Sequence, residues 1–336
     1  MHDKDSWYKY RRNHPLSSVH FHSTVQELQK KSAKMKTDFM FKGMMCPAFT
    51  PFMDDKKRSC NMEMIDKYCQ WMKSMGMQGV MVNGMTGEGM CMNMQERMQM
   101  AEKWHECTRK YGMTMLLNIG GMDLPSVYTL AEHAEKMKVD AVMMMPDMFY
   151  KPMTEEDLMM YMKDVMMRMP TRPVMYYHIP MMTGVHMDMC RWMMMMDKEC
   201  PMFAGVFWCH DHMDMMMMVK QKMPHFNYIM GTMSSMMGCM AQGMDAISMC
   251  AMNMCPEMCK QMYDCMMSCK MNDAMMMQQK MMKCIMDMFQ MDSDMHMNMD
   301  WMMMMRMQMD KMQPMGMKMG PMRRPQMTMN KMWYTM

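Results

Sequence analysis

The segment from Val82 to Gly89 combines a hydroxyl group with a flexible backbone. It reads Val-Asn-Gly-Met-Thr-Gly-Glu-Gly, so that Thr86 lies among three glycines. Glycines permit a tight turn whose exposed N–H groups, together with the Thr86 hydroxyl, could bind an anion such as a carboxylate. A purely structural turn between a strand and a helix would show the same pattern, so both interpretations stay open from the residues alone.

A second segment of chemical interest runs from Tyr176 to Val185 and reads Tyr-Tyr-His-Ile-Pro-Met-Met-Thr-Gly-Val. A tyrosine at the end of a strand can relay a proton, and the Pro and Gly would shape the loop around it. A tyrosine in a strand is also an ordinary core residue. The sequence therefore offers Tyr177 as a candidate that needs further support.

Two clusters could in principle hold a metal ion. His210-Asp211-His212 follows Cys209, and histidines two residues apart share one side of an extended chain, where a bound metal could polarise a carbonyl group. The alternative is a polar loop. The cysteines at 255, 259, 265 and 269 form two pairs four residues apart, which is just admissible for zinc but is also typical of small buried side chains. We predict neither a metal site nor a cofactor.

The elements that would position these side chains alternate between short strand-like runs and longer helical stretches, a pattern that favours a parallel sheet. Eight strand-like runs end near Thr50, Asn83, Ile119, Met145, His178, Phe207, Gly231 and Ser248. Predicted helices between them include Met62–Met75, Met94–Tyr111, Pro125–Met137 and Thr154–Met167, the last with a capping box formed by Thr154 and Asp157. Eight repeats predict an α/β fold, a closed (β/α)8 TIM barrel. An open doubly wound sheet is the alternative, but the segment 50–54 lacks the glycine of a phosphate loop.

The domain organisation follows from composition along the chain. Residues 1–40 are polar and basic and are predicted to form a flexible N-terminal extension. Residues 41–255 are predicted to form the barrel. Residues 256–336 are predicted to add C-terminal helices and a tail rich in Gly, Pro and Arg, packed on the barrel.

The two chemical segments resemble the Gly-Thr-Thr-Gly-Glu and Tyr-x-x-Pro signatures of the pyruvate-dependent class I aldolases, the superfamily of dihydrodipicolinate synthase and N-acetylneuraminate lyase. The longer string Tyr-Tyr-His-Ile-Pro with Thr-Gly-Val is similar to the animal N-acetylneuraminate lyases in particular. Supporting matches are Thr50-Pro51, Glu96-Arg97, Phe149-Tyr150-Lys151-Pro152, Gly231, Gly316, Gly320-Pro321 and Arg323. Together they cover residues 41 to about 325 in the order of the family.

The resemblance implies an enzyme that cleaves N-acetylneuraminate to N-acetylmannosamine and pyruvate. In such enzymes a lysine amine forms a Schiff base with the keto acid, which then serves as an electron sink. Tyr177 would move the proton, and Thr86 with the backbone of Gly84 and its neighbours would hold the substrate carboxylate. Gly231 would line the sugar-binding side, and Cys250 would contact the substrate where a serine is usual.

The sequence departs from the family pattern at the reacting position. The sixth strand reads Phe-Ala-Gly-Val-Phe-Trp-Cys, and the lysine of the family belongs where Phe207 stands. Met85 replaces the first Thr of the glycine turn, and Met233 and Ser234 replace an acidic pair that would bind the sugar. A methionine cannot accept hydroxyl hydrogen bonds as a carboxylate does.

Three functional hypotheses follow from this departure. The family's activity is sialic acid cleavage, but a benzyl side chain at position 207 cannot form an imine. Lys198, Lys220 and Lys222 read as surface helix residues and not as replacements for the missing amine. The alternatives are an inactive relative or redesigned scaffold that keeps the fold and binds a keto acid, and a lyase assisted by a metal.

Composition restricts partners and location. The formal net charge of +3 is spread over 38 basic and 35 acidic residues without long runs of one sign, so we expect neither nucleic acid nor a membrane as partner. Fifteen dispersed cysteines and a first segment without an apolar leader predict a cytoplasmic protein. The resemblance adds a small-molecule substrate and a homo-oligomer, typically a homotetramer.

Methionine is the compositional anomaly, with 89 copies against seven leucines. The excess is spread over the whole chain, whereas natural methionine-rich binding surfaces are local. We interpret it as substitution of other residues by methionine. A methionine in this sequence therefore says little about the side chain that the fold requires at that position.

Overall fold

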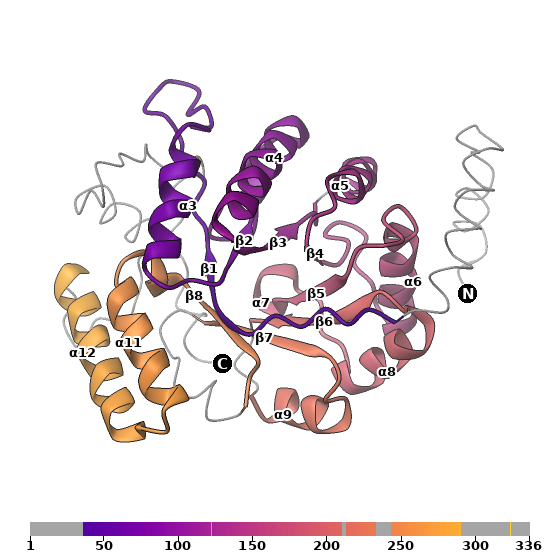
Figure 1. Cartoon of the computed structure of the whole chain (residues 1–336). Coiled ribbons are helices and arrows are strands. Elements are labelled where there is room, and N and C mark those ends of the chain that lie inside the picture. Colours follow the sequence, from indigo (N-terminus) through magenta and orange to yellow (C-terminus); the bar gives the residue numbers. More distant parts are fainter. Residues whose placement is uncertain (1–35, 122, 210–212, 233–242, 290–322, 324–336) are drawn as a thin grey trace, which may run out of the picture.

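The computed structural model describes residues 36–121, 123–209, 213–232, 243–289 and residue 323. Eight parallel strands form one closed sheet in the order β1 to β8, and helices surround it (Figure 1). Residue pairing between β1 and β8, at Gly43 with Ala246 and Met44 with Ile247, closes the ring. The predicted (β/α)8 barrel is therefore confirmed, and the open doubly wound sheet is excluded.

The strands of the barrel are β1 (Gly43–Pro47), β2 (Gly79–Val82), β3 (Thr114–Asn118), β4 (Ala141–Met144), β5 (Val174–His178), β6 (Phe203–Trp208), β7 (Asn227–Thr232) and β8 (Ala246–Met249). Seven predicted strand ends agree with these bounds to within one residue. The first does not, because the chain leaves the sheet after Pro47 and enters a loop in which Phe52 and Cys60 form an isolated antiparallel bridge. The prediction of a strand end near Thr50 was three residues too long.

The helices are α3 (Met64–Ser74), α4 (Met94–Tyr111), α5 (Leu124–Met137), α6 (Glu155–Met166), α7 (Pro180–Thr183), α8 (Met189–Glu199), α9 (Met213–Lys222), α11 (Pro256–Met267) and α12 (Met271–Phe289), with the short 3-10 helices η1 (Gly89–Cys91) and η2 (Cys250–Asn253). Helix α6 begins with the predicted capping box, in which Thr154 and Asp157 each bond the other's backbone N–H. Helices α11 and α12 follow the last strand, as predicted for the C-terminal helices.

Strand β6 contains an irregularity that decides which side chains enter the barrel. Val174 of β5 pairs with Phe203, but the next residue pairs with Gly205, so Ala204 is an extra residue in β6. Gly205 has φ +145°, and a Cβ there would lie 2.0 Å from the backbone oxygen of Asn227. Only glycine fits this close approach, as is common at bulges. The bulge reverses the alternation of the strand from this point on.

The buried hydrophobic side chains form two clusters, one on each side of the sheet. The outer cluster fills the space between the sheet and the helices and includes Phe203, Val206 and Trp208 of β6. The inner cluster fills the barrel and includes Ala204 and Phe207 of the same strand. Ala204 and Phe207 are three residues apart and could not face the same side of a regular strand. Phe207 therefore points into the barrel because of the bulge at Gly205.

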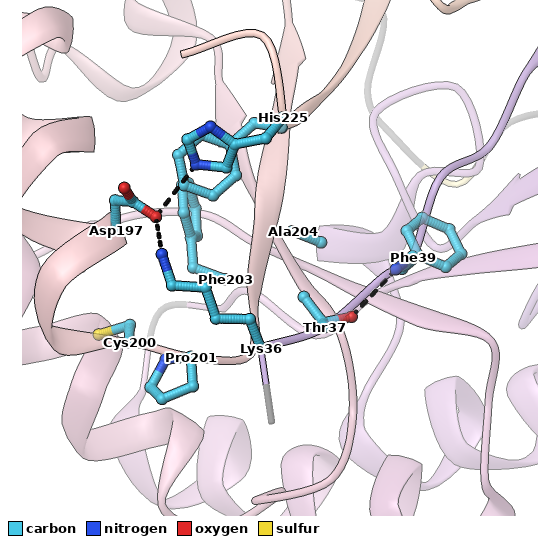
Figure 2. Close-up of a pocket in the computed structure, with 10 residues that line it drawn as sticks. Lys36, Thr37, Phe39, Asp197, Cys200, Pro201, Phe203, Ala204 and His225 are labelled. Atoms are coloured by element: carbon cyan, nitrogen blue, oxygen red, sulfur yellow. Dashed lines mark hydrogen bonds and ion pairs between the residues drawn. The ribbon is translucent and has the colours of Figure 1, made fainter. Parts of the chain in front are cut away.

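The amino end of the barrel is covered by the described residues that precede β1. The backbone N–H of Phe41 donates to Asn227 Oδ1, and Asn227 Nδ2 donates back to the Phe41 oxygen. Figure 2 shows a small pocket at this end, where Asp197 accepts from Lys36 at 2.6 Å and pairs with His225 at 3.1 Å. Residues 36–40 thus contact the barrel, while residues 1–35 lie outside the described residues. The domain boundaries at 40 and 255 remain predictions.

Candidate active site

The carboxyl ends of the strands bring Tyr177 and Phe207 together inside the barrel. The two residues pair across β5 and β6, and their ring centroids lie 5.3 Å apart in an edge-to-face arrangement. Tyr177 is 2% exposed and Phe207 is 1% exposed. In (β/α)8 enzymes the active site lies at this end of the strands. The candidate catalytic tyrosine therefore faces a phenyl ring, which offers no polar atom to it.

Hydrogen bonds join the Tyr177 hydroxyl to the backbone of Met85 and to the thiol of Cys209. Burial is the main reason why the pKa of Tyr177 lies well above its usual value, and the nearby thiols of Cys209 and Cys250 raise it further. The phenol consequently stays protonated over the physiological range. It can donate a hydrogen bond to a bound ligand.

The glycine turn after β2 forms a compact, hydrogen-bonded loop. Gly89 donates its N–H to the Gly84 oxygen at 3.1 Å, and the Thr50 hydroxyl donates to the Gly87 oxygen. A Cβ at Gly89 would lie 2.0 Å from the Asn83 oxygen, so the backbone segments approach too closely for any side chain. Gly84 belongs to this loop, because its carbonyl oxygen accepts the hydrogen bond from Gly89.

Thr86 and Cys250 meet at the mouth of the barrel although 164 positions separate them in sequence. Thr86 Oγ1 lies 3.5 Å from Cys250 Sγ, a distance suited to a hydrogen bond in which either atom donates. Burial raises the pKa of Cys250, so its side chain is a neutral thiol. Below them Asn253 donates to the Pro47 oxygen at 3.0 Å, which fastens η2 to β1.

Gly231 at the end of β7 touches Phe207 and Cys209. A Cβ at Gly231 would lie 2.1 Å from Cys209 Sγ and 2.6 Å from Phe207 Cε1. The glycine therefore leaves room for these two side chains. Met233 and Ser234, at which the acidic pair of the family was sought, lie outside the described residues. The structure places Gly231 beside the predicted site.

Ser248 is a candidate that the sequence analysis missed. It lies on β8 two residues after Ala246, which belongs to the inner cluster, and opposite Gly231 in the pairing with β7. Its side chain therefore faces the inside of the barrel. Ser248 is 2% exposed, and its hydroxyl has no hydrogen-bond partner in the structure. The alternation Ala-Ile-Ser-Met in β8 was the available signal.

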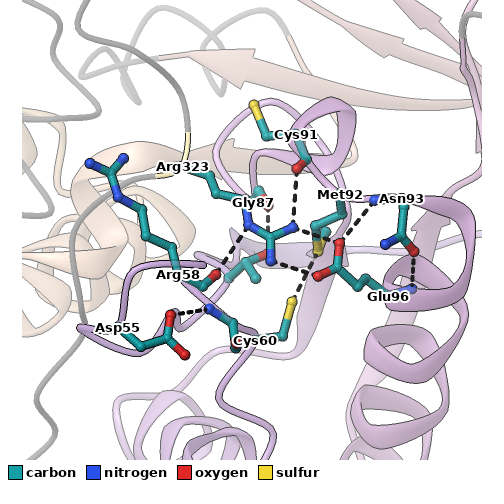
Figure 3. A network of polar contacts seen from close by, with 11 residues as sticks. Asp55, Arg58, Cys60, Gly87, Cys91, Met92, Asn93, Glu96 and Arg323 are labelled. Carbon is teal, nitrogen blue, oxygen red and sulfur yellow. Dashed lines mark hydrogen bonds and ion pairs between the residues drawn. The ribbon is translucent and has the colours of Figure 1, made fainter.

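The glycine turn is braced by a residue from the far end of the chain. Arg323 Nη2 and Nη1 donate to the two carboxylate oxygens of Glu96 at 2.6 and 2.5 Å, and its Nε donates to the Arg58 oxygen at 3.1 Å (Figure 3). Because Glu96 also caps α4 at Asn93, this bidentate pair joins Arg323 to the helix that follows the turn. The Arg323 hydrogen bonds lower the pKa of Glu96.

The alternative metal and amine sites gain no support. His210, Asp211 and His212 lie outside the described residues. Within the described part of the chain no three His, Cys, Asp or Glu side chains are placed to hold a metal, so the cysteines at 255, 259, 265 and 269 do not form a zinc site there. The described helices include none that is long and apolar enough to cross a membrane.

The three lysines considered as substitutes lie outside the barrel. Lys198 and Lys222 are exposed. Lys220 is less exposed than predicted, because its ammonium group lies 3.2 Å from Asp245 and over the Tyr228 ring. Tyr228 belongs to the outer cluster, so Lys220 lies on the helix side of the sheet. None of the three amines reaches the position of the Phe207 ring.

These features define a (β/α)8 barrel with a glycine-rich turn and a buried tyrosine at the carboxyl ends of its strands. The family model for the dihydrodipicolinate synthetase family matches residues 40–333, and the chain belongs to this family. It is similar to N-acetylneuraminate lyase of Xenopus tropicalis, with 31% identity over 204 residues, which is 60% of this chain and 66% of that protein. The match thus spans slightly less than two thirds of that relative.

Solved structures support the fold. N-acetylneuraminate lyase of Proteus mirabilis superposes with a TM-score of 0.77 at 20% identity, covering 87% of this chain and 94% of that chain. A catalytic lysine mutant of the Ruminococcus gnavus sialic acid aldolase superposes with a TM-score of 0.76 at 20% identity, covering 87% and 92%. The family resemblance stated from the sequence motifs is therefore confirmed.

Proposed function

We propose that this chain is an N-acetylneuraminate lyase-like barrel that binds a small α-keto acid but has lost cleavage through a lysine Schiff base. One observation carries the proposal. The Phe207 ring, 1% exposed, occupies the inside of the barrel beside Tyr177, at the position where the resemblance places the lysine. The Ruminococcus gnavus sialic acid aldolase, whose solved structure is that of a catalytic lysine mutant, has a catalytic lysine.

Without an amine at position 207 the electron sink is missing. Aldol cleavage breaks the bond between the α and β carbons of the keto group and leaves an electron pair on the α carbon, which a protonated imine accepts far better than a ketone does. A phenyl ring neither forms an imine nor stabilises an oxyanion. Since Lys198, Lys220 and Lys222 lie on the outside of the sheet, no one of them supplies the amine.

Binding of a keto acid rests on groups that are still in place. The carboxylate would accept hydrogen bonds from the Thr86 hydroxyl and from the backbone of the turn at Gly84. The Tyr177 hydroxyl would donate to the keto oxygen, in keeping with its raised pKa. The buried, unpartnered Ser248 hydroxyl would gain the partner that it lacks in the free protein. Gly231 and Cys250 would border the same ligand.

Recognition of a whole sialic acid is weaker than recognition of its keto-acid end. The predicted sugar-binding positions at 233 and 234 carry a methionine and a serine in place of acidic residues. We therefore propose pyruvate-like keto acids as the ligand class. A cytoplasmic location and a homotetramer remain predictions from the resemblance.

The test combines binding and trapping. Pyruvate is added to the full chain, binding is followed by ligand-observed NMR, and a parallel sample is reduced with borohydride and weighed by mass spectrometry. We expect saturable binding without a covalent adduct, and no pyruvate release from N-acetylneuraminate. A reduced pyruvate adduct on any lysine would contradict the loss of Schiff-base chemistry. Absence of saturable binding would contradict the keto-acid site.

A further inference from the structure

The C-terminal helices α11 and α12 form an antiparallel pair beside the barrel (Figure 1, orange). Their register can be read from a sulfur contact, because Cys259 Sγ of α11 lies 3.7 Å from Met281 Sδ of α12. In an antiparallel pair, a residue one turn earlier on α11 faces a residue about one turn later on α12. This register sets Cys255, the N-cap of α11, opposite Cys284.

The two thiols are in contact. A side-chain hydrogen bond joins Cys255 and Cys284, and their surroundings differ. Cys255 is 5% exposed, whereas Cys284 is half-buried and can be reached from solvent. Burial raises the pKa of Cys255 to about 12, so this residue stays a thiol at neutral pH. One accessible and one protected thiol in contact is the arrangement of an oxidisable cysteine with its resolving partner.

We propose that Cys255 and Cys284 are a redox modification site that forms a reversible disulfide on exposure to hydrogen peroxide. The sulfur of Cys284 attacks one peroxide oxygen, the O–O bond breaks, and a sulfenic acid and one water result. The thiol of Cys255 then attacks the sulfur of Cys284, the S–S bond forms and a second water leaves. Two thiols lose one electron each, peroxide accepts both, and a dithiol reductant reverses the step.

Two other buried thiols have contacts that cannot lead to a disulfide. Cys69 and Cys259 contact the thioether sulfurs of Met113 and Met281, which cannot form a disulfide. The proposed bond would join the residue before α11 to α12. It would close a loop from residue 255 to residue 284, which contains α11 and most of α12. A cross-link of this kind restricts the unfolded chain and stabilises the folded one. The proposal does not depend on keto-acid binding.

The experiment uses the reduced full chain treated with hydrogen peroxide in small excess, followed by alkylation of the remaining thiols and peptide mapping. We expect a peptide in which Cys255 and Cys284 are linked, and a loss of mass equal to two hydrogen atoms. The oxidised protein should unfold about 5 to 10 °C above the reduced one, and dithiothreitol should abolish this difference. Peptide mapping identifies the linked cysteines in the parent protein itself, so this part of the test does not depend on a variant that folds.

Variants then assign the effect. Cys255→Ser and Cys284→Ser should each abolish the linkage and the thermal shift, while Cys259→Ser, one turn away on the same helix, should retain both. Accumulation of Cys284 sulfenic acid with Cys255 still free would overturn the proposal. Linkage of Cys284 to a different cysteine in protein that keeps its circular dichroism would overturn it as well.

Discussion

The glycine turn at 84–89 and the end of β6 differ in how closely their residues match the signature that the resemblance predicts. In the turn, the backbone hydrogen bonds and the Thr86 hydroxyl are present. Met85 differs from the predicted threonine only in its side chain, and its backbone still forms a hydrogen bond with Tyr177. In β6, the bulge at Gly205 still aims position 207 into the barrel, but the side chain there is Phe207. A strand can therefore keep the backbone geometry that aims a side chain into the barrel while the chemistry of that side chain differs from the one that the resemblance predicts.

Phe207→Lys is the change with the largest expected effect on this comparison. The bulge should aim the introduced amine at Tyr177, and burial among apolar residues favours the neutral, nucleophilic form. We expect a borohydride-trapped pyruvate adduct and an increase in cleavage of a 2-keto acid substrate by about 10³-fold or more. Pyruvate release in a coupled assay measures it.

The matched control is Phe207→Met, which keeps an apolar side chain without an amine and should stay inactive. If the lysine variant folds, shows the circular dichroism of the parent and forms no adduct, the assignment of position 207 to the reacting site is wrong. Tyr177→Phe in the lysine background should lower turnover more than it lowers adduct formation.

Gly205→Ala disturbs the backbone of the bulge in β6 and leaves the functional side chains of the candidate site unchanged. Its Cβ would lie 2.0 Å from the Asn227 oxygen at φ +145°. We expect a loss of about 3 kcal/mol or more in the free energy of unfolding, from overlap and backbone strain together. Gly112→Ala is the control, since Gly112 has φ +62° but nothing within 4 Å, and should cost about 1 to 2 kcal/mol. Equal losses in urea unfolding would show that the bulge is not a tight constraint.

Glu96→Gln tests the bidentate ion pair between Arg323 and Glu96 beside the glycine turn. Because Arg323 lowers the pKa of Glu96 in the folded state, the carboxylate stabilises the fold above its unfolded pKa, and this contribution is lost as pH falls through the lower folded pKa. We expect a loss of about 1 to 2 kcal/mol at pH 7, measured by urea unfolding. The difference from the parent should vanish in acid.

Glu106→Gln on the same helix provides the comparison. Its partner Lys103 lies at 2.9 Å, but the Glu106 side chain is 65% exposed, so solvent screens the pair. Stability should change little at any pH. A loss as large as that of the Glu96 variant would mean that charge on α4, and not the contact with Arg323, is responsible.

Thr86→Val has the smallest expected effect and concerns the part of the site that is still in place. The variant removes one hydroxyl and keeps the shape of the side chain. We expect pyruvate affinity to fall about fivefold, corresponding to one hydrogen bond of about 1 kcal/mol. Cys250→Ala, which removes the thiol 3.5 Å from the hydroxyl and not the hydroxyl itself, should lower pyruvate affinity less than Thr86→Val does. Equal binding by the Thr86 variant and the parent would place the carboxylate elsewhere.

Local sequence signals predicted the elements well because short-range chemistry controls them. The bounds of α4 and the capping box of α6 agree with the prediction, since caps and apolar periodicity act within one or two turns. The end of β1 was misplaced because the loop after Pro47 is held by a pairing between Phe52 and Cys60, which local pattern does not reveal.

The candidate site was predictable in part. Thr86 and Tyr177 were found because they lie in motifs, and the structure brings both to the same end of the barrel. Ser248 was missed, since the alternation in β8 shows which side the serine shares with Ala246 but not that this side faces the inside of the barrel. Its role as an unpartnered hydroxyl depends on which neighbours the closed sheet supplies.

The sequence by itself determined the order of strands and helices, the glycine turn, and the presence of Phe207 at the position where the resemblance places a lysine. Only the tertiary structure decided that Phe207 points into the barrel, that Arg323 binds Glu96, and that Cys255 meets Cys284. The physical reason is that these outcomes depend on register between segments far apart in the chain. A single extra residue in β6 reverses every later side chain of the strand, and local pattern alone does not reveal this.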